Sequence, residues 1–275
     1  MFKKGIKIIA IMAIISLASG CTNYRQPTDD VSNMPTVINS SKSSATISGN
    51  SVNYTDLYKP IINAYIALEK SGYTTYDEKI LSKDVCLIPG GNSSSLIDYE
   101  KQPVLVYAFC NLGGDDTPEL LIGADLGIAD GDTPGSNVFV TGIYGLRDDK
   151  PVSFIQVGAW SQLNFFMDKN GNPVIEKISG THIDYATENF YKIDKPEKLI
   201  SLDKLYTYGK IRDDNKPDDI SYSHTNDING KEVNITKQEY LALMQKYGSV
   251  GYLDNTGDFK ANEIVINSWK LLSKY

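Results

Sequence analysis

The sequence predicts an α+β fold, with an antiparallel β-meander around a central hairpin at residues 103–124 and helices flanking it at the N- and C-terminal ends. Two observations lead to this prediction. Apolar segments with period-2 alternation recur between short turn sequences through the middle of the chain. Segments with helical spacing and N-cap residues lie on either side of them. Helices segregated from strands are typical of α+β domains, whereas α/β folds alternate the two.

The N-terminus reads as a targeting segment. Residues 1–21, MFKKGIKIIAIMAIISLASGC, combine a basic start with an apolar run from Ile8 to Leu17. That run is shorter than the roughly 20 residues that span a bilayer, so a secretory leader is favoured over a transmembrane helix. The ending Ser19-Gly20-Cys21 resembles a bacterial lipobox, although Leu17 lies one residue further from the cysteine than that motif favours. The alternative is an ordinary cleaved leader with an incidental cysteine.

The lipobox resemblance implies that the Cys21 thiol takes a diacylglycerol and becomes the new N-terminus. The chain would then be anchored in the cell membrane and face outward. We therefore expect a signal peptide at residues 1–20, a lipid-anchored flexible tether at 21–53 and a single globular domain at 54–275. The tether is rich in Ser, Thr, Asn and Asp, and it holds too few large apolar residues to offset the entropy of ordering it.

A helix is expected at the start of the globular domain. Helical spacing joins five apolar residues, and Asp56 is the candidate N-cap. Pro60 falls in the first turn, where its missing N–H costs little, and Ser71-Gly72 ends the helix. A weaker helical piece is expected at residues 77–81. The apolar residues of the first helix are Leu57, Ile61, Ala64, Tyr65 and Leu68.

The central hairpin, PVLVYAFCNLGGDDTPELLIGA, is the most apolar part of the domain. Both alternating sets of its first strand are apolar, which predicts a strand covered on both faces. Residues 119–122 continue in the same style after a polar turn. Cys110 lies in the first strand, so a small buried thiol is favoured over pairing with Cys86, and that pairing stays open.

The turn of this hairpin resembles the D-x-D-x-D-G-x-P-E-L loop of uncharacterised surface lipoproteins from Gram-positive bacteria, and residues 117–122, TPELLI, match that pattern. The resemblance implies a calcium-type loop. Asn111 stands at the first aspartate position and Gly113 at the second, Asp115 keeps the third, and Asp116 replaces the glycine. Such a resemblance brings no known activity with it.

The candidate metal ligands are Asn111, Asp115 and Glu119, with the Thr117 carbonyl. They supply about four oxygens, whereas calcium takes six to eight. One alternative is a weak calcium site, and the other, which we favour, is a turn that keeps the geometry without metal. No other cofactor is expected. The series Asp168-x-Asn170-x-Asn172 also matches the start of a calcium loop, but hairpin-turn chemistry already explains it.

A meander follows the hairpin. Strand pairs are expected at 138–144 with 152–157, at 163–167 with 173–178, and at 189–193 with 199–208. After the meander, Thr236 and Glu239 form a capping box that opens a helix through Tyr247. Asn262 is the candidate N-cap of a last helix, which would carry Ile264, Ile266, Trp269 and Leu272.

Charge and motifs narrow the function. The formal net charge of −7 disfavours a nucleic-acid partner, because phosphates are bound by Lys and Arg. Catalytic motifs are thin: Ser201-x-x-Lys204 lacks its companion elements, and His182 and His224 have no Cys or His at metal-ligand spacing. Five tyrosines fall on the meander, where outward rings could stack on a sugar or peptide, although tyrosine is also an ordinary strand residue: Tyr144, Tyr185, Tyr191, Tyr206 and Tyr208.

Two functions remain. The favoured hypothesis is a non-catalytic, surface-anchored binding or accessory module for an extracellular protein or glycan. The alternative is an extracellular glycan or peptidoglycan hydrolase that uses carboxylates of the loops at 125–132 or 212–219, because acids from distant strands cannot be paired from sequence.

Overall fold

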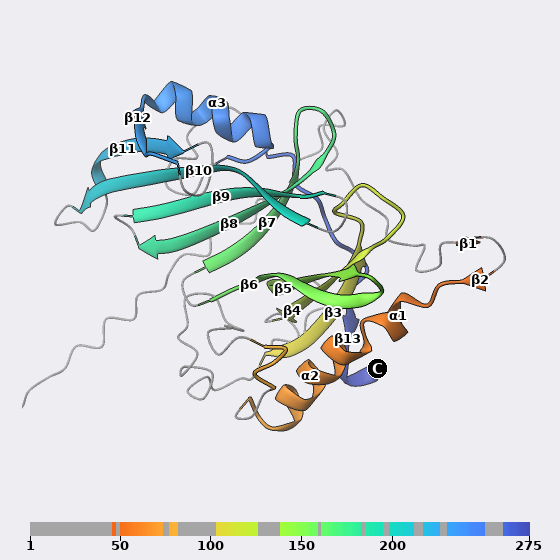
Figure 1. The fold of residues 1–275 in the computed structure, drawn as a ribbon. Helices are drawn as coiled ribbons and strands as arrows, with labels where there is room; N and C mark the ends of the chain where they lie inside the picture. The colour runs from red at the N-terminus through yellow and green to blue at the C-terminus, as the bar shows by residue number, and fades with distance from the viewer. Residues whose placement is uncertain are drawn as a thin grey trace, which may run out of the picture. The chain divides into compact units, whose positions relative to one another are not determined.

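The structure is a computed structural model, and the residues described in it lie within Pro35–Tyr275. The described residues are 46–47, 50–73, 77–81, 103–125, 138–158, 161–182, 185–194, 198–211, 217–225, 230–250 and 261–275. They form mainly antiparallel β-structure with few helices (Figure 1). A two-residue strand pair, β1 (Thr46–Ile47) with β2 (Asn50–Ser51), falls within the segment expected to be a tether. None of the described helices is long and apolar enough to cross a membrane.

The first large sheet has five strands in the order β13-β3-β4-β5-β6, and every neighbouring pair is antiparallel. Its centre is the predicted hairpin, which is confirmed: β3 pairs with β4 from Val104 opposite Asp125 to Cys110 opposite Glu119. The two strands lie between other strands and are buried along almost their whole length. The strands are β3 (Val104–Cys110), β4 (Glu119–Asp125), β5 (Val138–Arg147), β6 (Lys150–Gln156) and β13 (Lys270–Leu271).

One face of this sheet is covered by the N-terminal helices α1 (Tyr54–Leu57) and α2 (Lys59–Lys70). Apolar residues of α2 and of alternate positions on β3 and β4 form one buried cluster. The predicted helix is therefore present, but it is divided into α1 and α2. Asn53 caps α1, and its side chain accepts a hydrogen bond from the Thr55 N–H; α2 begins after Tyr58 and has Ser71 as its C-cap, so the predicted N-cap Asp56 is wrong. Residues 77–81 form a single turn, closed by the Leu81 N–H on the Asp77 carbonyl at 2.8 Å.

The second large sheet has six strands in the order β12-β11-β10-β9-β8-β7. Its strands follow one another along the chain, so the predicted meander is confirmed for this part of the protein. The turn at residues 168–172 places Gly171 at φ +80°, the left-handed conformation that its Asn-Gly pair favours. The strands are β7 (Ser161–Met167), β8 (Pro173–His182), β9 (Tyr185–Asp194), β10 (Lys198–Ile211), β11 (Pro217–Thr225) and β12 (Val233–Ile235).

The two sheets pack against each other through an apolar cluster that we call the inter-sheet cluster. It joins Cys110, Leu121 and Ile143 of the five-stranded sheet to Phe165 and Ile175 of the six-stranded sheet. The opposite face of the six-stranded sheet is covered by α3 (Lys237–Tyr247), which the predicted capping box opens. The described layers are therefore α2, the five-stranded sheet, the six-stranded sheet and α3, in this order (Figure 1).

Two predictions about this architecture are wrong. The meander does not surround the hairpin within one sheet, because β6 and β7 do not pair and the strands divide between two sheets. The helix expected from Asn262 is also absent: residues 261–275 carry a bridge from Glu263 to Phe166, then β13, then a 3-10 turn, η3 (Leu272–Lys274). The Asn262 side chain donates to the Met167 carbonyl at 3.1 Å instead of capping a helix. Pairing with exposed strand edges has overridden the helical spacing of this segment.

Candidate functional site

Three tyrosines gather on the six-stranded sheet, and we call this group the tyrosine row: Tyr185, Tyr206 and Tyr208. Tyr206 and Tyr208 lie two residues apart on β10 and so share a face of the sheet. Tyr185 of β9 lies directly opposite Tyr208 in the strand register. The ring centroids of Tyr206 and Tyr208 are 6.2 Å apart with planes 7° from parallel, and those of Tyr185 and Tyr208 are 5.3 Å apart with planes at 34°.

The tyrosine row continues the face that packs against the five-stranded sheet, beyond the part that this sheet covers. Tyr191 and Ile193, further along β9 on the same face, pack in or against the inter-sheet cluster. Tyr185 and Tyr206 are half-buried, and Tyr208 is 37% exposed. The row is thus anchored at its base and open along its edge.

Polar groups border the tyrosine row. The Lys204 Nζ lies 4.7 Å from the centroid of the Tyr206 ring, a distance at which a cation is attracted to the ring face. The Tyr185 hydroxyl lies 2.5 Å from the Thr187 Oγ1. Burial, then the negative charge of Glu232, raises the pKa of Tyr208 to about 12. A tyrosine hydroxyl is protonated at neutral pH even without this shift and can donate a hydrogen bond.

Gly180 makes the position of Tyr185 possible. It has φ +68°, and a Cβ at this residue would lie 2.4 Å from the Tyr185 Cε1. Any larger residue at 180 would therefore push the Tyr185 ring out of the row. The other two tyrosines singled out in the sequence lie elsewhere: Tyr144 is fully buried and shares a 2.9 Å hydrogen bond with Tyr65, and Tyr191 packs against the inter-sheet cluster.

The opposite face of the same sheet carries three buried carboxylates, Glu176, Glu188 and Asp203, on the neighbouring strands β8, β9 and β10. The Tyr240 hydroxyl of α3 donates to both oxygens of Glu188, at 2.9 and 3.0 Å. The Ser249 hydroxyl donates to the Glu176 Oε1 at 2.8 Å, and burial raises the pKa of Glu176. Hydroxyl groups from α3 and from the residues after it therefore donate hydrogen bonds to these carboxyl groups.

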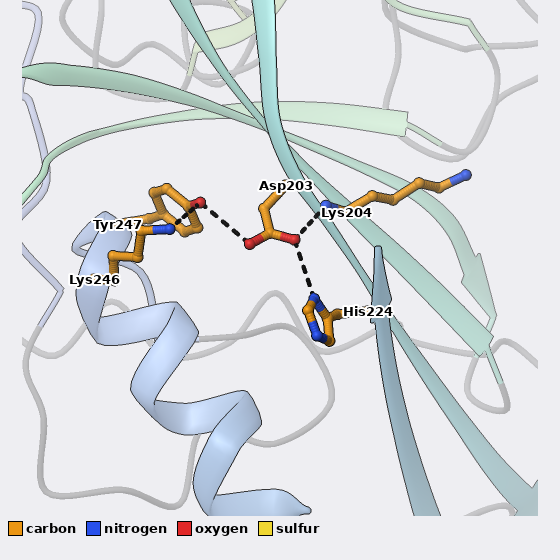
Figure 2. Close-up of polar contacts among 5 residues, drawn as sticks. All are labelled: Asp203, Lys204, His224, Lys246 and Tyr247. Atoms are coloured by element: carbon orange, nitrogen blue, oxygen red, sulfur yellow. Dashed lines mark hydrogen bonds and ion pairs between the residues drawn. The ribbon is translucent and has the colours of Figure 1, made fainter. Parts of the chain in front are cut away.

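Asp203 has polar contacts with its own strand, with β11 and with α3 (Figure 2). Its Oδ2 accepts from the Tyr247 hydroxyl at 3.3 Å, and its Oδ1 accepts from the Lys204 N–H at 3.0 Å. The Nδ1 of His224, a residue isolated in the sequence, lies 3.5 Å from the Asp203 Oδ1. The Lys246 ammonium donates to the Tyr247 hydroxyl at 2.8 Å. The Asp203 side chain is 4% exposed and that of His224 is 27% exposed. The contacts of Asp203 therefore link β10 to β11 and α3, and the His224 imidazole is partly accessible to solvent.

The structure brings the three predicted metal ligands together in one turn, but their polar atoms serve the turn itself. The Asn111 Oδ1 accepts from the Gly114 N–H at 2.8 Å, and the Asp115 Oδ1 accepts from the Thr117 N–H at 2.8 Å. The Glu119 Oε2 accepts from the Leu112 N–H at 2.7 Å. Burial raises the pKa of Glu119 to about 7, against the lowering effect of these backbone donors.

The turn is also held by hydroxyl groups from the first helices. Tyr54 donates to the Asp116 carbonyl at 3.1 Å, and Tyr58 donates to the Pro118 carbonyl at 3.0 Å. Over the described ranges no group of three or more His, Cys, Asp or Glu side chains is placed to hold a metal ion. The side chains of Asn111, Asp115 and Glu119 fit a self-stabilised turn, and both alternatives, a weak calcium site and a turn without metal, stay predictions.

The remaining predicted site residues fall in different places. Three of them lie outside the described residues, namely Cys21 and the loop aspartates Asp130 and Asp132, and so does the side chain of His182. Cys110 is a buried free thiol, and burial raises its pKa to about 12. Asp125 is fully buried at the end of β4. Sequence reasoning did not connect Lys204, Glu232 or Gly180 with the tyrosines. For Lys204 a signal was available, because Lys204, Tyr206 and Tyr208 occupy every second position of a strand and so share a face.

The chain was compared with protein-family models, curated proteins and solved structures, and it matches none of them. The candidate site is therefore argued from the contacts within this chain alone.

Proposed function

We propose that this protein is a non-catalytic binding or accessory module, anchored in the cell membrane by a lipid on Cys21 and facing outward. Its ligand site is the tyrosine row. The observation that carries the proposal is the gathering of Tyr185, Tyr206 and Tyr208 into one partly exposed group. Tyrosine offers a large, rigid, amphipathic contact area at a low cost in side-chain entropy, which suits it to ligand recognition.

The proposal includes the α+β class of the domain and the division of the chain into three segments. We take the domain as α+β, with α2 and α3 as the helices that flank the sheets. Residues 1–20 serve as the leader, 21–53 as the tether, and 54–275 as the binding domain. A flexible tether suits an anchored binding module because it lets the domain reach ligands away from the membrane.

Binding is favoured over catalysis by the state of the acidic groups. A catalytic carboxylate must reach the substrate, but Glu176, Glu188 and Asp203 receive hydrogen bonds beneath α3 and are almost completely buried. The alternative is a glycan or peptidoglycan hydrolase that uses acids at 125–132 or 212–219. Of these, Asp125 is fully buried.

The test compares tyrosines inside and outside the tyrosine row. The full chain, purified in detergent and immobilised, is exposed to solubilised cell-envelope and host-surface material. We expect Tyr206→Ala with Tyr208→Ala to weaken binding by about tenfold or more, since each ring contributes on the order of 1 kcal/mol. Tyr275→Ala is the matched control, because Tyr275 is 41% exposed and lies outside the row.

Equal binding by the double variant and the wild type would contradict the proposal. Glycan turnover is assayed in parallel. Turnover that survives the tyrosine substitutions and disappears with Asp130→Asn or Asp132→Asn would favour the hydrolase instead.

Anchoring is tested separately. Cells that express the wild type or Cys21→Ala are grown with a labelled fatty acid, and label is expected only in the wild type. If the two proteins take up label equally, or if neither does, the lipid anchor is wrong.

A further inference from the structure

We infer that the ligand of the tyrosine row is an uncharged glycan chain. This inference rests on the function proposed above and adds the chemical class of the ligand. It is carried by three features of the row: the arrangement of its rings, the pair of opposite charges beside it, and the scarcity of aliphatic side chains around it.

The rings and their hydroxyls match the two kinds of surface that a sugar presents. A pyranose ring has C–H groups that pack on an aromatic face and hydroxyl groups that exchange hydrogen bonds at its edge. Tyr206 and Tyr208 offer nearly parallel rings, 7° apart in plane, on successive outward positions of β10. The Tyr208 hydroxyl is protonated at neutral pH, as any tyrosine hydroxyl is, and can exchange hydrogen bonds with a sugar. The exposed Ser221, opposite Tyr208 in the register with β11, adds a further hydroxyl.

Charges of both signs border the tyrosine row. Lys204 lies over the Tyr206 ring, and the Glu232 carboxylate lies near enough to Tyr208 to raise its pKa. The Ser223 hydroxyl donates to Glu232 and holds this carboxylate beside the row. The opposite charges of Lys204 and Glu232 largely cancel for a polymer that carries charge of a single sign, and the net charge of −7 disfavours an anionic polymer. A neutral polyhydroxylated chain can accept from the ammonium and donate to the carboxylate.

A protein ligand fits this surface less well. The core of a protein interface is built from buried apolar and aromatic anchors surrounded by a polar rim. Over the part of the chain that the structure describes, the exposed large hydrophobic residues are Tyr208, Val233 and Tyr275. Only Tyr208 belongs to the tyrosine row, so among the described residues no exposed large aliphatic side chain joins the row to complete such a core.

The experiment separates the ligand's class from its existence. Cell-envelope polysaccharide is divided by anion exchange into a neutral pool and an anionic pool. Each pool is tested before and after periodate, which cleaves vicinal diols of sugars, and before and after protease. The full chain in detergent should bind the neutral pool, lose that binding after periodate and keep it after protease. Affinity should change less than about twofold as salt rises, since no counterions are released by a neutral ligand.

Charge variants give a second, independent readout. A neutral glycan predicts that Lys204→Gln and Glu232→Gln each weaken binding by about two- to fivefold, because each replaces a charged hydrogen-bonding partner with a weaker neutral one. An anionic ligand predicts opposite signs, with weaker binding for Lys204→Gln and tighter binding for Glu232→Gln.

Each outcome is decisive. Binding that depends on Tyr206 and Tyr208 but is lost to protease and resists periodate overturns the glycan and leaves the proposed function standing. Binding confined to the anionic pool, or charge variants of opposite sign, does the same. Binding that is unaffected by Tyr206→Ala with Tyr208→Ala, or absent from both pools and from protein extracts, overturns the proposed function itself.

Discussion

The two sheets of this protein bury their faces by different chemistry. In the five-stranded sheet, β3 and β4 present apolar side chains to α2 on one face and to the second sheet on the other. In the six-stranded sheet, the face beneath α3 buries Glu176, Glu188 and Asp203 among aromatic rings, and each receives a hydrogen bond from a hydroxyl group. Apart from Glu119 at the edge of β4, the first sheet depends mainly on packing volume, which pH does not change. The second also depends on individual hydrogen bonds and on the protonation of its acids.

The largest expected effect tests the apolar sheet. Ile122 of β4 is fully buried in the cluster shared with α2. Ile122→Ala should lower the free energy of unfolding by about 2–5 kcal/mol, because it removes apolar contacts and leaves a cavity. Urea denaturation measures the loss, which should be nearly the same at pH 5 and pH 8. Val233→Ala is the control: Val233 is 52% exposed, so a change above about 0.5 kcal/mol there would show that the comparison of burial is misplaced.

The next effect tests the hydrogen bonds beneath α3. Tyr240→Phe removes the hydroxyl that donates to both oxygens of the Glu188 carboxylate. Its loss should cost about 2 kcal/mol, since both oxygens of a fully buried carboxyl group lose this donor. Tyr65→Phe is the matched variant on the other side of the molecule, where the partner is the neutral Tyr144 hydroxyl, and should cost about 1 kcal/mol. Equal losses in the two variants would remove the distinction between the two regions.

A third prediction concerns pH and links the two regions. Burial raises the pKa of Glu119 to about 7, and it raises that of Glu176 as well. Between about pH 4.5 and pH 7 the folded protein therefore keeps protons that the unfolded chain has released. Their contribution to stability is full below about pH 4.5 and is lost as the pH rises through the folded-state pKa.

Glu119→Gln should remove this contribution at the edge of the apolar sheet. The difference in unfolding free energy between wild type and variant should therefore change by on the order of 2 kcal/mol over this range, in favour of the wild type at low pH. Glu176→Gln should act in the same direction from the other sheet. A difference that grows in favour of the wild type as the pH rises would contradict the raised pKa values.

The smallest expected effect is that of calcium on the turn of the central hairpin. The Asp115 and Glu119 side chains already accept backbone N–H groups, so we expect no change in melting temperature when calcium is added after chelator treatment. A site with a dissociation constant near 10⁻⁴ M would add roughly 1–3 kcal/mol at millimolar calcium. A stabilisation of that size, abolished by Asp115→Asn, would show that the turn is a working metal loop.

Elements with a local cause could be predicted from the amino-acid chain alone. The Thr236–Glu239 capping box, the Asn170-Gly171 turn and the β3–β4 hairpin each depend on residues that are close together in the chain. Local hydrogen bonds and backbone preferences suffice to specify such features, so a single sequence can be read for them.

The division of the strands between two sheets depends on contacts between distant segments, and so does the set of residues that share a face. A β-bulge on β10 lies between Ser201, which pairs with Tyr191, and Asp203, which pairs with Phe190. Because one extra residue reverses the alternation, Asp203 turns beneath α3 while Tyr206 and Tyr208 turn to the opposite face. Simple alternation from Ser201 would have placed Asp203 on the face of Tyr191.

The same limit explains the candidate site and the last segment of the chain. Glu188 and Tyr240 are 52 residues apart, and the Tyr208–Tyr185 contact depends on the register of β9 with β10. Residues within 261–271 pair with strand edges that cannot be predicted from the local sequence. Their helical spacing therefore led to the wrong prediction of a helix. Side-chain pattern specifies which residues are apolar and where turns fall, whereas strand register, sheet partners and bulges arise from contacts between distant segments.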